Sequence, residues 1–158
     1  MRIRKIIIEP KALKSDTYWR TDDMQHRYSW IFEKTKPMRG GWKWRSATAT
    51  SIDGREYLFL TQCNPMRDQW KARLILRMPS GQVSLVSRLE HHGTHPGLHA
   101  HAHCERGALE EGSSSIDHLG RFPTAEKPHR RRNTWREHTF WEKARQHFRI
   151  HDLKGPLV

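Results

Sequence analysis

Histidine recurs at alternate positions in the stretch THPGLHAHAHCERG, which spans residues 94–107. His99, His101 and His103 are separated by alanines, and Cys104 follows directly. The imidazole side chain has an ordinary pKa of about 6.5, so it exchanges protons near neutral pH, and it is also a common zinc ligand. The tract therefore offers proton transfer or metal binding, and the third alternative is a polar sheet face without chemistry.

The spacing of the tract is that of a β-strand, in which successive side chains point to opposite faces. A strand over 98–104 turns the histidines to one face, and the leucine, the alanines and Cys104 to the core side. Same-face neighbours have Cα atoms about 6.7 Å apart, which places His99 and His103 about 13 Å apart. Because Zn–N bonds are only about 2.0 Å long, two of the histidines can share one ion and three cannot.

A metal site would combine His99 and His101 with a third ligand such as His95, and the ion would be zinc or another divalent metal. Cys104 faces away from the histidines in a regular strand, and no Cys-x-x-Cys motif accompanies the tract. The sequence therefore favours no cofactor, although a metal stays open as an alternative.

Metal-free cleavage of RNA needs a base for the 2′-OH proton, an acid for the leaving oxygen, and cations for the charge that develops on the phosphate. Histidine suits both proton roles, and arginine suits the third. If strands at 83–90 and 98–104 are neighbours, their outward residues share one face. The candidate catalytic residues are therefore His99, His101, Arg88 and Glu90.

Positive charge dominates the composition, with 29 Lys and Arg against 17 Asp and Glu and a net charge of +12. Such a field attracts polyanions, so RNA or another nucleic acid is the expected partner. Basic strand residues, the loop cluster at 127–133 and the WKWR segment at 42–45 suit phosphate contacts and base stacking. The loop cluster could equally be a solvated run, and the tryptophans core residues. The candidate nucleic-acid-binding residues are Arg73, Arg77, Arg130, Arg131, Arg132, Trp42 and Trp44.

No segment has the apolar length of a membrane-spanning helix, and the apolar run at 6–8 is too short for a signal peptide. The two cysteines, Cys63 and Cys104, are too few for a disulfide framework. We therefore expect a cytoplasmic protein with no membrane partner, and the sequence leaves its oligomeric state open.

A chain of 158 residues is long enough for one domain with a single core. We expect that domain at 27–150, after an N-terminal arm at 1–26 and before a tail at 151–158. A loop insert rich in Ser, Gly and Pro is expected at about 105–133. The arm is expected to be irregular or partly helical, and within it the segment IRKIII at 3–8 could form a short strand.

Alternating polar and apolar residues predict successive strands, joined by turn signals at Asp53-Gly54 and at PSGQ in 79–82. After the loop insert, TWRE predicts a capping box with Thr134 as N-cap of a helix that has one apolar face. The fold class is α+β, a curved antiparallel β-meander of about five to six strands packed by a C-terminal α-helix. Its outer face should carry Lys, Arg and His. The expected strands lie at 27–35, 42–50, the second half of 51–63, 68–78, 83–90 and 98–104.

The segment SRLEHHGTHPGLHAH resembles the TumE-like toxins of small two-gene toxin–antitoxin modules. Those proteins combine a strand meander with an Arg-x-acid pair, a gap containing Gly, a His-x-His pair and a C-terminal helix with a Phe-Trp pair. Where that family has Lys before the Gly and an acidic residue before the first His, this chain has Pro96 and Leu98, and it carries an extra insert. The resemblance implies a growth-inhibiting toxin that acts on RNA and is neutralised by a partner antitoxin. Over about residues 55–150 the counterparts are Arg88 and Glu90, Gly97, His99 and His101, and TFWEKARQHF.

The sequence therefore favours a toxin-like ribonuclease of a toxin–antitoxin or phage-defence system, a hydrolase with metal-independent acid/base catalysis. His99 and His101 would transfer protons, Arg88 would stabilise the phosphorane, and Glu90 would orient a histidine. The alternatives are a non-catalytic nucleic-acid-binding protein and a metal-dependent nuclease that uses the His-x-His pair.

Overall fold

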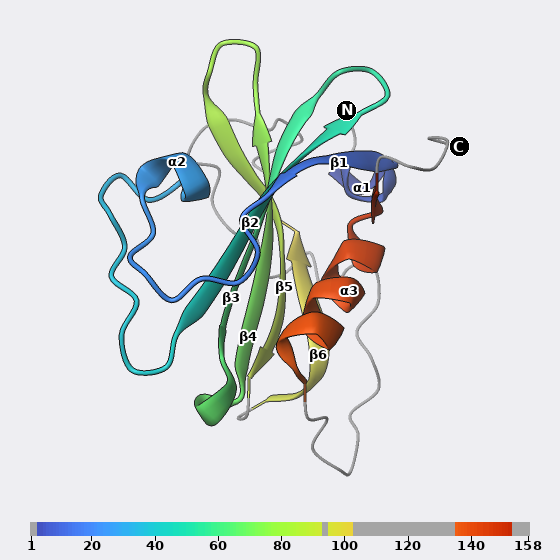
Figure 1. The fold of residues 1–158 in the computed structure, drawn as a ribbon. Helices are drawn as coiled ribbons and strands as arrows, with labels where there is room; N and C mark the ends of the chain where they lie inside the picture. Colours follow the sequence, from blue (N-terminus) through green and yellow to red (C-terminus); the bar gives the residue numbers. More distant parts are fainter. Residues whose placement is uncertain (1–2, 93–94, 103–134, 153–158) are drawn as a thin grey trace.

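A single curled sheet organises the computed structural model, which describes residues 3–92, 95–102 and 135–152. The sheet has seven strands in the order β6-β5-β4-β3-β2-β1-β7, all antiparallel neighbours except the parallel pair β1 and β7 (Figure 1). The predicted α+β class and meander are confirmed, with a strand count slightly higher than expected. The strands are β1 (Lys11–Asp16), β2 (Lys43–Ser51), β3 (Glu56–Asn64), β4 (Gln69–Arg77), β5 (Val83–His92), β6 (His95–Ala102) and β7 (Ile150–His151). The helices are α1 (Ile3–Ile8), α2 (His26–Ser29), the 3-10 turn η1 (Pro65–Arg67) and α3 (Glu137–His147).

Tight turns at glycines connect the central strands in sequence order, as predicted. Gly54 has φ +85 between β2 and β3, and Gly81 has φ +89 between β4 and β5. Both conformations lie in the left-handed region that glycine adopts without steric cost. These turns hold β2 to β5 in antiparallel register, so alternate side chains on each strand face the same side.

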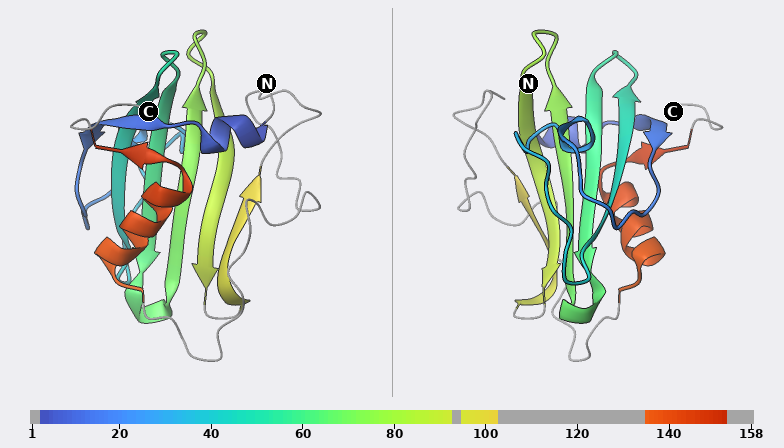
Figure 2. Two further views of the ribbon diagram at one scale, coloured as in Figure 1. Left: turned by 90° about the vertical axis from the view of Figure 1, so that its right-hand side faces the viewer. Right: turned by 60° about the vertical axis from the view of Figure 1, so that its left-hand side comes forward.

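Helix α3 covers one face of the sheet and builds the main core there (Figure 2, left). Trp141 stacks on Phe59 with ring centroids 4.5 Å apart, and Phe140 meets Trp70 at 5.5 Å. Ala72 and Ala100 on the sheet are small and fully or nearly fully buried beneath this layer. The expected docking of the C-terminal helix on the apolar face is therefore confirmed.

The opposite face is not a uniformly basic surface, contrary to the prediction. The segment 17–42, which includes α2, crosses that face over β2 and β3 (Figure 1; Figure 2, right). Trp44 is 0% exposed there, and its indole N–H donates to the Asp22 carbonyl at 2.6 Å. The buried residues of this second core are Met24, Trp30, Trp44, Leu58, Leu60 and Ile75. On the same face, Lys71 and Arg73 of β4 and Arg88 and Glu90 of β5 are not part of that core.

Three local predictions were wrong for identifiable reasons. Residues 3–8 form a helix, because adjacent Ile6 and Ile7 are both buried in the same core, which a strand would not allow. The segment 27–35 holds α2 and irregular chain instead of a strand, since Trp30 at φ +61 ends the helix and the segment crosses the sheet. Helix α3 begins at Glu137 after the N-cap Arg136, whereas the predicted cap Thr134 lies outside the described residues.

Part of the expected N-terminal arm belongs to the sheet, because β1 pairs with β2 from Lys11 opposite Ser51 to Asp16 opposite Ala47. The expected insert at 105–133 lies outside the described residues, as does most of the tail. Within the described ranges, no helix is long and apolar enough to cross a membrane.

Candidate functional site

The pairing of β5 with β6 brings the four candidate catalytic residues onto one face. Arg88 lies opposite His101, and Glu90 lies opposite His99, in antiparallel register. The pairing of β5 with β6 shifts register only between Glu90 and His92. Side chains therefore alternate regularly between the two faces of the sheet at both of these pairs. The predicted neighbourhood of the two strands is therefore observed, and it sits on the face away from α3.

Glu90 is the centre of this group, which we call the His–Glu cluster: Arg88, Glu90, His92, His99 and His101. Glu90 is 8% exposed, and its carboxylate forms an ion pair with the Arg88 Nε. The Nε2 atoms of His99 and His92 lie 3.7 and 3.8 Å from Glu90 Oε2. The ring centroids of His99 and His101 are 5.2 Å apart. One carboxylate therefore lies beside an arginine and two imidazoles.

The same cluster offers a set of metal-ligand atoms. One ligand atom each from Glu90, His99 and His101 can be chosen so that all lie within 4.8 Å of one another. Two ligands bound at about 2.1 Å to one ion lie at most about 4.2 Å apart, so the widest separations would have to close. The third ligand here is Glu90, which sequence reasoning did not name for a metal. The backbone of the expected ligand His95 lies opposite His92.

Two further cations border the cluster from β4, where Lys71 lies opposite Glu90 and Arg73 lies opposite Arg88. Burial, together with the nearby Arg88, lowers the pKa of Arg73 to about 10, and Glu90 opposes this shift. Burial and the nearby Arg73 likewise lower the pKa of Lys71. Both shifts report positive charge crowded into a poorly solvated place, which is the condition for attracting an anion.

The other predicted nucleic-acid residues fall in different places. The Arg77 guanidinium lies over the Trp30 ring at 3.7 Å and 3.9 Å from the Glu56 carboxylate. Arg77 is four residues after Arg73 on β4 and so faces the same side of the sheet. Trp44 is fully buried, so its prediction as a base-stacking residue was wrong, and Trp42 is half-buried. The basic residues Arg130, Arg131 and Arg132, with His103 and Cys104, lie outside the described residues.

Lys71 and Arg73, the two cations that border the cluster, also line a cavity of about 570 Å³. Its size is within the range of ligand pockets, roughly 300–1,000 Å³. The lining residues are Phe32, Lys36, Pro37, Met38, Arg39, Trp42, Gln62, Lys71 and Arg73. Sequence reasoning selected only Trp42 and Arg73 from this set. Lys71 shares the alternation of Arg73 and could have been chosen, whereas Phe32 reaches the cavity through the crossing segment.

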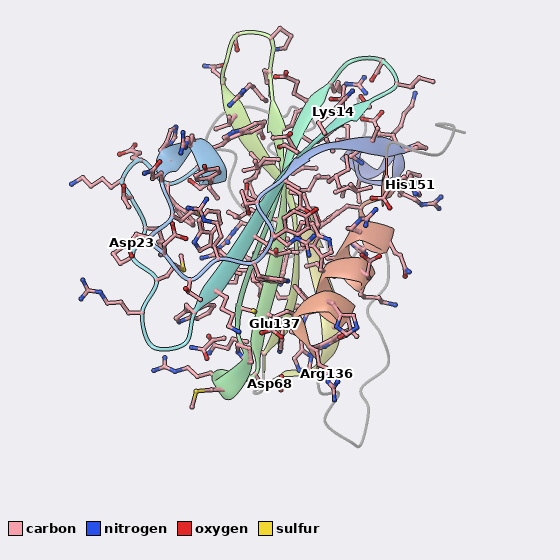
Figure 3. The ribbon with its side chains drawn as sticks, viewed as in Figure 1. Lys14, Asp23, Asp68, Arg136, Glu137 and His151 are labelled. Carbon is pink, nitrogen blue, oxygen red and sulfur yellow. The ribbon has the colours of Figure 1, made fainter. Side chains whose placement is uncertain are left out.

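His91 belongs to the other face, although it neighbours the cluster in sequence. Its Nε2 lies 3.1 Å from Asp68 Oδ2, and Asp68 also accepts a hydrogen bond from the Trp70 indole at 3.1 Å. Asp68 lies at the end of the sheet near which α3 begins at Glu137 (Figure 3). The His91–Asp68 pair therefore supports packing on the α3 side and stays apart from the His–Glu cluster.

Comparison with protein-family models, with curated proteins and with solved structures finds no match to this chain. The candidate site therefore rests on its own geometry.

Proposed function

We propose that this chain is a ribonuclease that cleaves RNA by metal-independent acid/base catalysis. The observation that carries the proposal is the His–Glu cluster, in which two imidazoles, a carboxylate and a guanidinium face the same side beside two half-buried cations. Proton donors and acceptors next to crowded positive charge suit a reaction at a phosphate.

In the proposed reaction, one histidine of the pair His99 and His101 takes the proton from a ribose 2′-OH. The 2′-oxygen attacks the adjacent phosphorus, and the bond from phosphorus to the 5′-oxygen breaks. The second histidine gives a proton to that leaving oxygen. The products are a 2′,3′-cyclic phosphate and a 5′-hydroxyl, with one proton taken up and one released by the protein.

The neighbouring charges have separate roles in this proposal. Arg88, Lys71 and Arg73 stabilise the negative charge that grows on the phosphoryl oxygens. Glu90 is a positioning residue, because its carboxylate lies beside the His99 Nε2 and the Arg88 Nε. A carboxylate that orients an imidazole fixes which ring nitrogen faces the substrate.

The test incubates the purified full chain with single-stranded RNA in EDTA. Cleavage is expected, and His101→Ala and His99→Ala should each lower the rate by about a hundredfold or more. His138→Ala is the matched control, because His138 is exposed on α3 and distant in sequence from the cluster. Salt-dependent RNA binding without turnover, unaffected by His101→Ala, would falsify the catalytic proposal and favour the binding-protein alternative.

A metal-dependent nuclease is the second candidate, favoured by the ligand geometry of Glu90, His99 and His101. In that case EDTA abolishes cleavage and zinc or manganese restores it. Zinc titration calorimetry is an independent readout, since the wild type and His138→Ala would bind zinc whereas His99→Ala would not. Full activity in EDTA, with no zinc binding, contradicts this candidate.

The biological setting proposed here is a cytoplasmic toxin of a toxin–antitoxin or phage-defence system, neutralised by a cognate antitoxin protein. Expression of the full chain should slow growth, and the His101→Ala variant should not. A gene for a small helix-turn-helix or acidic protein beside this one supports the antitoxin. Unimpaired growth at confirmed expression contradicts the toxin proposal.

A further inference from the structure

The cavity beside the His–Glu cluster has a lining that proton transfer does not explain. Its walls combine the aromatic rings of Phe32 and Trp42, the amide of Gln62 and four cationic side chains. A phosphate site needs only the cations. Aromatic faces and an amide beside them are the groups that recognise a nucleobase, by stacking and by edge hydrogen bonds.

The Phe32 ring is a fixed platform on this wall. The Phe32 backbone N–H donates to the Ser29 hydroxyl at 3.2 Å, and its carbonyl oxygen lies 2.7 Å from the His26 Nδ1. The Lys36 ammonium lies 4.9 Å from the ring centroid, and the Arg73 guanidinium carbon lies 5.6 Å from it. A half-buried ring held at both backbone groups loses little freedom when a base stacks on it.

The Gln62 amide has a defined orientation. Gln62 is 6% exposed, and its side-chain carbonyl accepts a hydrogen bond from the Arg73 guanidinium. Since a guanidinium can only donate, the amide oxygen must face Arg73, and the NH2 group is turned elsewhere. Among the described residues, none accepts a hydrogen bond from that NH2 group. The two N–H donors are therefore left for a ligand in the cavity that Gln62 lines.

We infer that this cavity holds one unpaired nucleobase of single-stranded RNA, next to the phosphate whose cleavage the His–Glu cluster catalyses. The inference rests on the proposed ribonuclease function and names its substrate class. Lys71 and Arg73 belong to both places, so a base in the cavity and a phosphate at the cluster are held by shared cations. A duplex keeps its bases stacked and paired, and for that reason only an unpaired base can enter.

The free amide donors also bind the edge of the base. They pair with an acceptor there, such as a carbonyl oxygen of uracil or a ring nitrogen of adenine. A ligand that offers these donors no acceptor leaves them unpaired and binds less tightly. The cavity therefore prefers an intact nucleobase to an abasic position.

The test measures fluorescence anisotropy of labelled oligouridylate and of an abasic ribose-phosphate oligomer of equal length, with His101→Ala as the non-cleaving background. Oligouridylate should bind at least about tenfold more tightly than the abasic oligomer. Adding Phe32→Ala should weaken oligouridylate binding by about tenfold or more. Gln62→Glu keeps the shape and removes the donors, so it should reduce the preference for oligouridylate over the abasic oligomer. Tyr18→Ala is the matched control, since this exposed ring lies beside Arg45, which stacks on Trp141 of α3.

Each outcome separates the inference from the proposed function. If the wild type cleaves RNA but Phe32→Ala and Gln62→Glu leave affinity and preference unchanged, the base pocket is wrong and the ribonuclease stands. If RNA binds with the expected dependence on Phe32 and Gln62 but is never cleaved, the pocket stands and the ribonuclease is wrong. If the chain binds no RNA, both are overturned.

Discussion

Replacing Glu90 by glutamine removes the negative charge of the His–Glu cluster while keeping its shape. Glu90 is 8% exposed, pairs with Arg88, and lies 3.7 Å from the His99 Nε2. It also raises the pKa of Lys71 and of Arg73 against the effect of burial. The substitution therefore leaves three poorly solvated cations without their compensating charge.

Two estimates give the expected loss of stability on Glu90→Gln. A pair of unit charges about 4 Å apart is worth about 4 kcal/mol at an effective dielectric constant of about 20. Removing one partner of a buried ion pair typically costs about 3–5 kcal/mol. Because the Arg88 side chain is 26% exposed, water recovers part of this cost. We therefore expect Glu90→Gln to lower the free energy of unfolding by about 2–3 kcal/mol.

The assay is urea unfolding followed by tryptophan fluorescence, with Glu142→Gln as the matched control. Glu142 is 54% exposed and pairs with Arg145 on the surface of α3, so its loss should change stability by about 0.5 kcal/mol or less. Inorganic phosphate should restore part of the stability of Glu90→Gln and leave the control unchanged, because an added anion replaces the lost charge. Equal stability of the two variants would refute the role given to Glu90.

Three further predictions concern the core and its titrating groups. Lys11 is 0% exposed, and burial lowers its pKa to about 7 from the ordinary 10.5. Between these two pH values the unfolded state binds more protons than the folded state, so the free energy of unfolding should rise with pH. Urea titrations should show this rise in the wild type and not in Lys11→Met, and equal slopes would contradict it. Burial lowers the pKa of His147 to about 4 from the ordinary 6.5. The free energy of unfolding should therefore fall by about 2–3 kcal/mol as the pH drops from 6.5 to 4, and His147→Leu should remove this fall. Phe140 is 0% exposed on the buried face of α3, so Phe140→Ala should cost about 3–5 kcal/mol in the same assay, and a loss below about 1 kcal/mol would contradict the packing of α3.

Local sequence signals were sufficient to predict the strands and turns of the central sheet. The Asp53-Gly54 and PSGQ turns and the period-two alternation of β4 depend on backbone geometry that neighbouring residues determine. The same periodicity predicts Arg88, Glu90, His99 and His101 on one face if their two strands are neighbours, and β5 and β6 do pair in this way. Alternation and adjacency along the chain thus predicted four of the five residues of the His–Glu cluster, all except His92.

The remaining part of the site depends on contacts between distant segments. The aromatic residues at 27–35 suggested a strand, but they are buried because the segment crosses β2 and β3. That crossing covers Trp44 and brings Phe32 to Gln62 and Arg73, which no local pattern indicates. The cavity and the burial of Trp44 could not be predicted from the sequence, because tertiary packing and not residue periodicity decides which of these side chains are exposed.

The chemical ends of the products test the central claim most directly. Single-stranded RNA cleaved by the full chain in EDTA should yield fragments that end in a 2′,3′-cyclic phosphate and begin with a 5′-hydroxyl, identified by mass spectrometry. A single 2′-deoxy substitution at the cleaved position should block that cut, because the attacking oxygen is missing. Fragments with 3′-hydroxyl and 5′-phosphate ends, or cleavage that tolerates the 2′-deoxy position, would contradict acid/base transfer by His99 and His101.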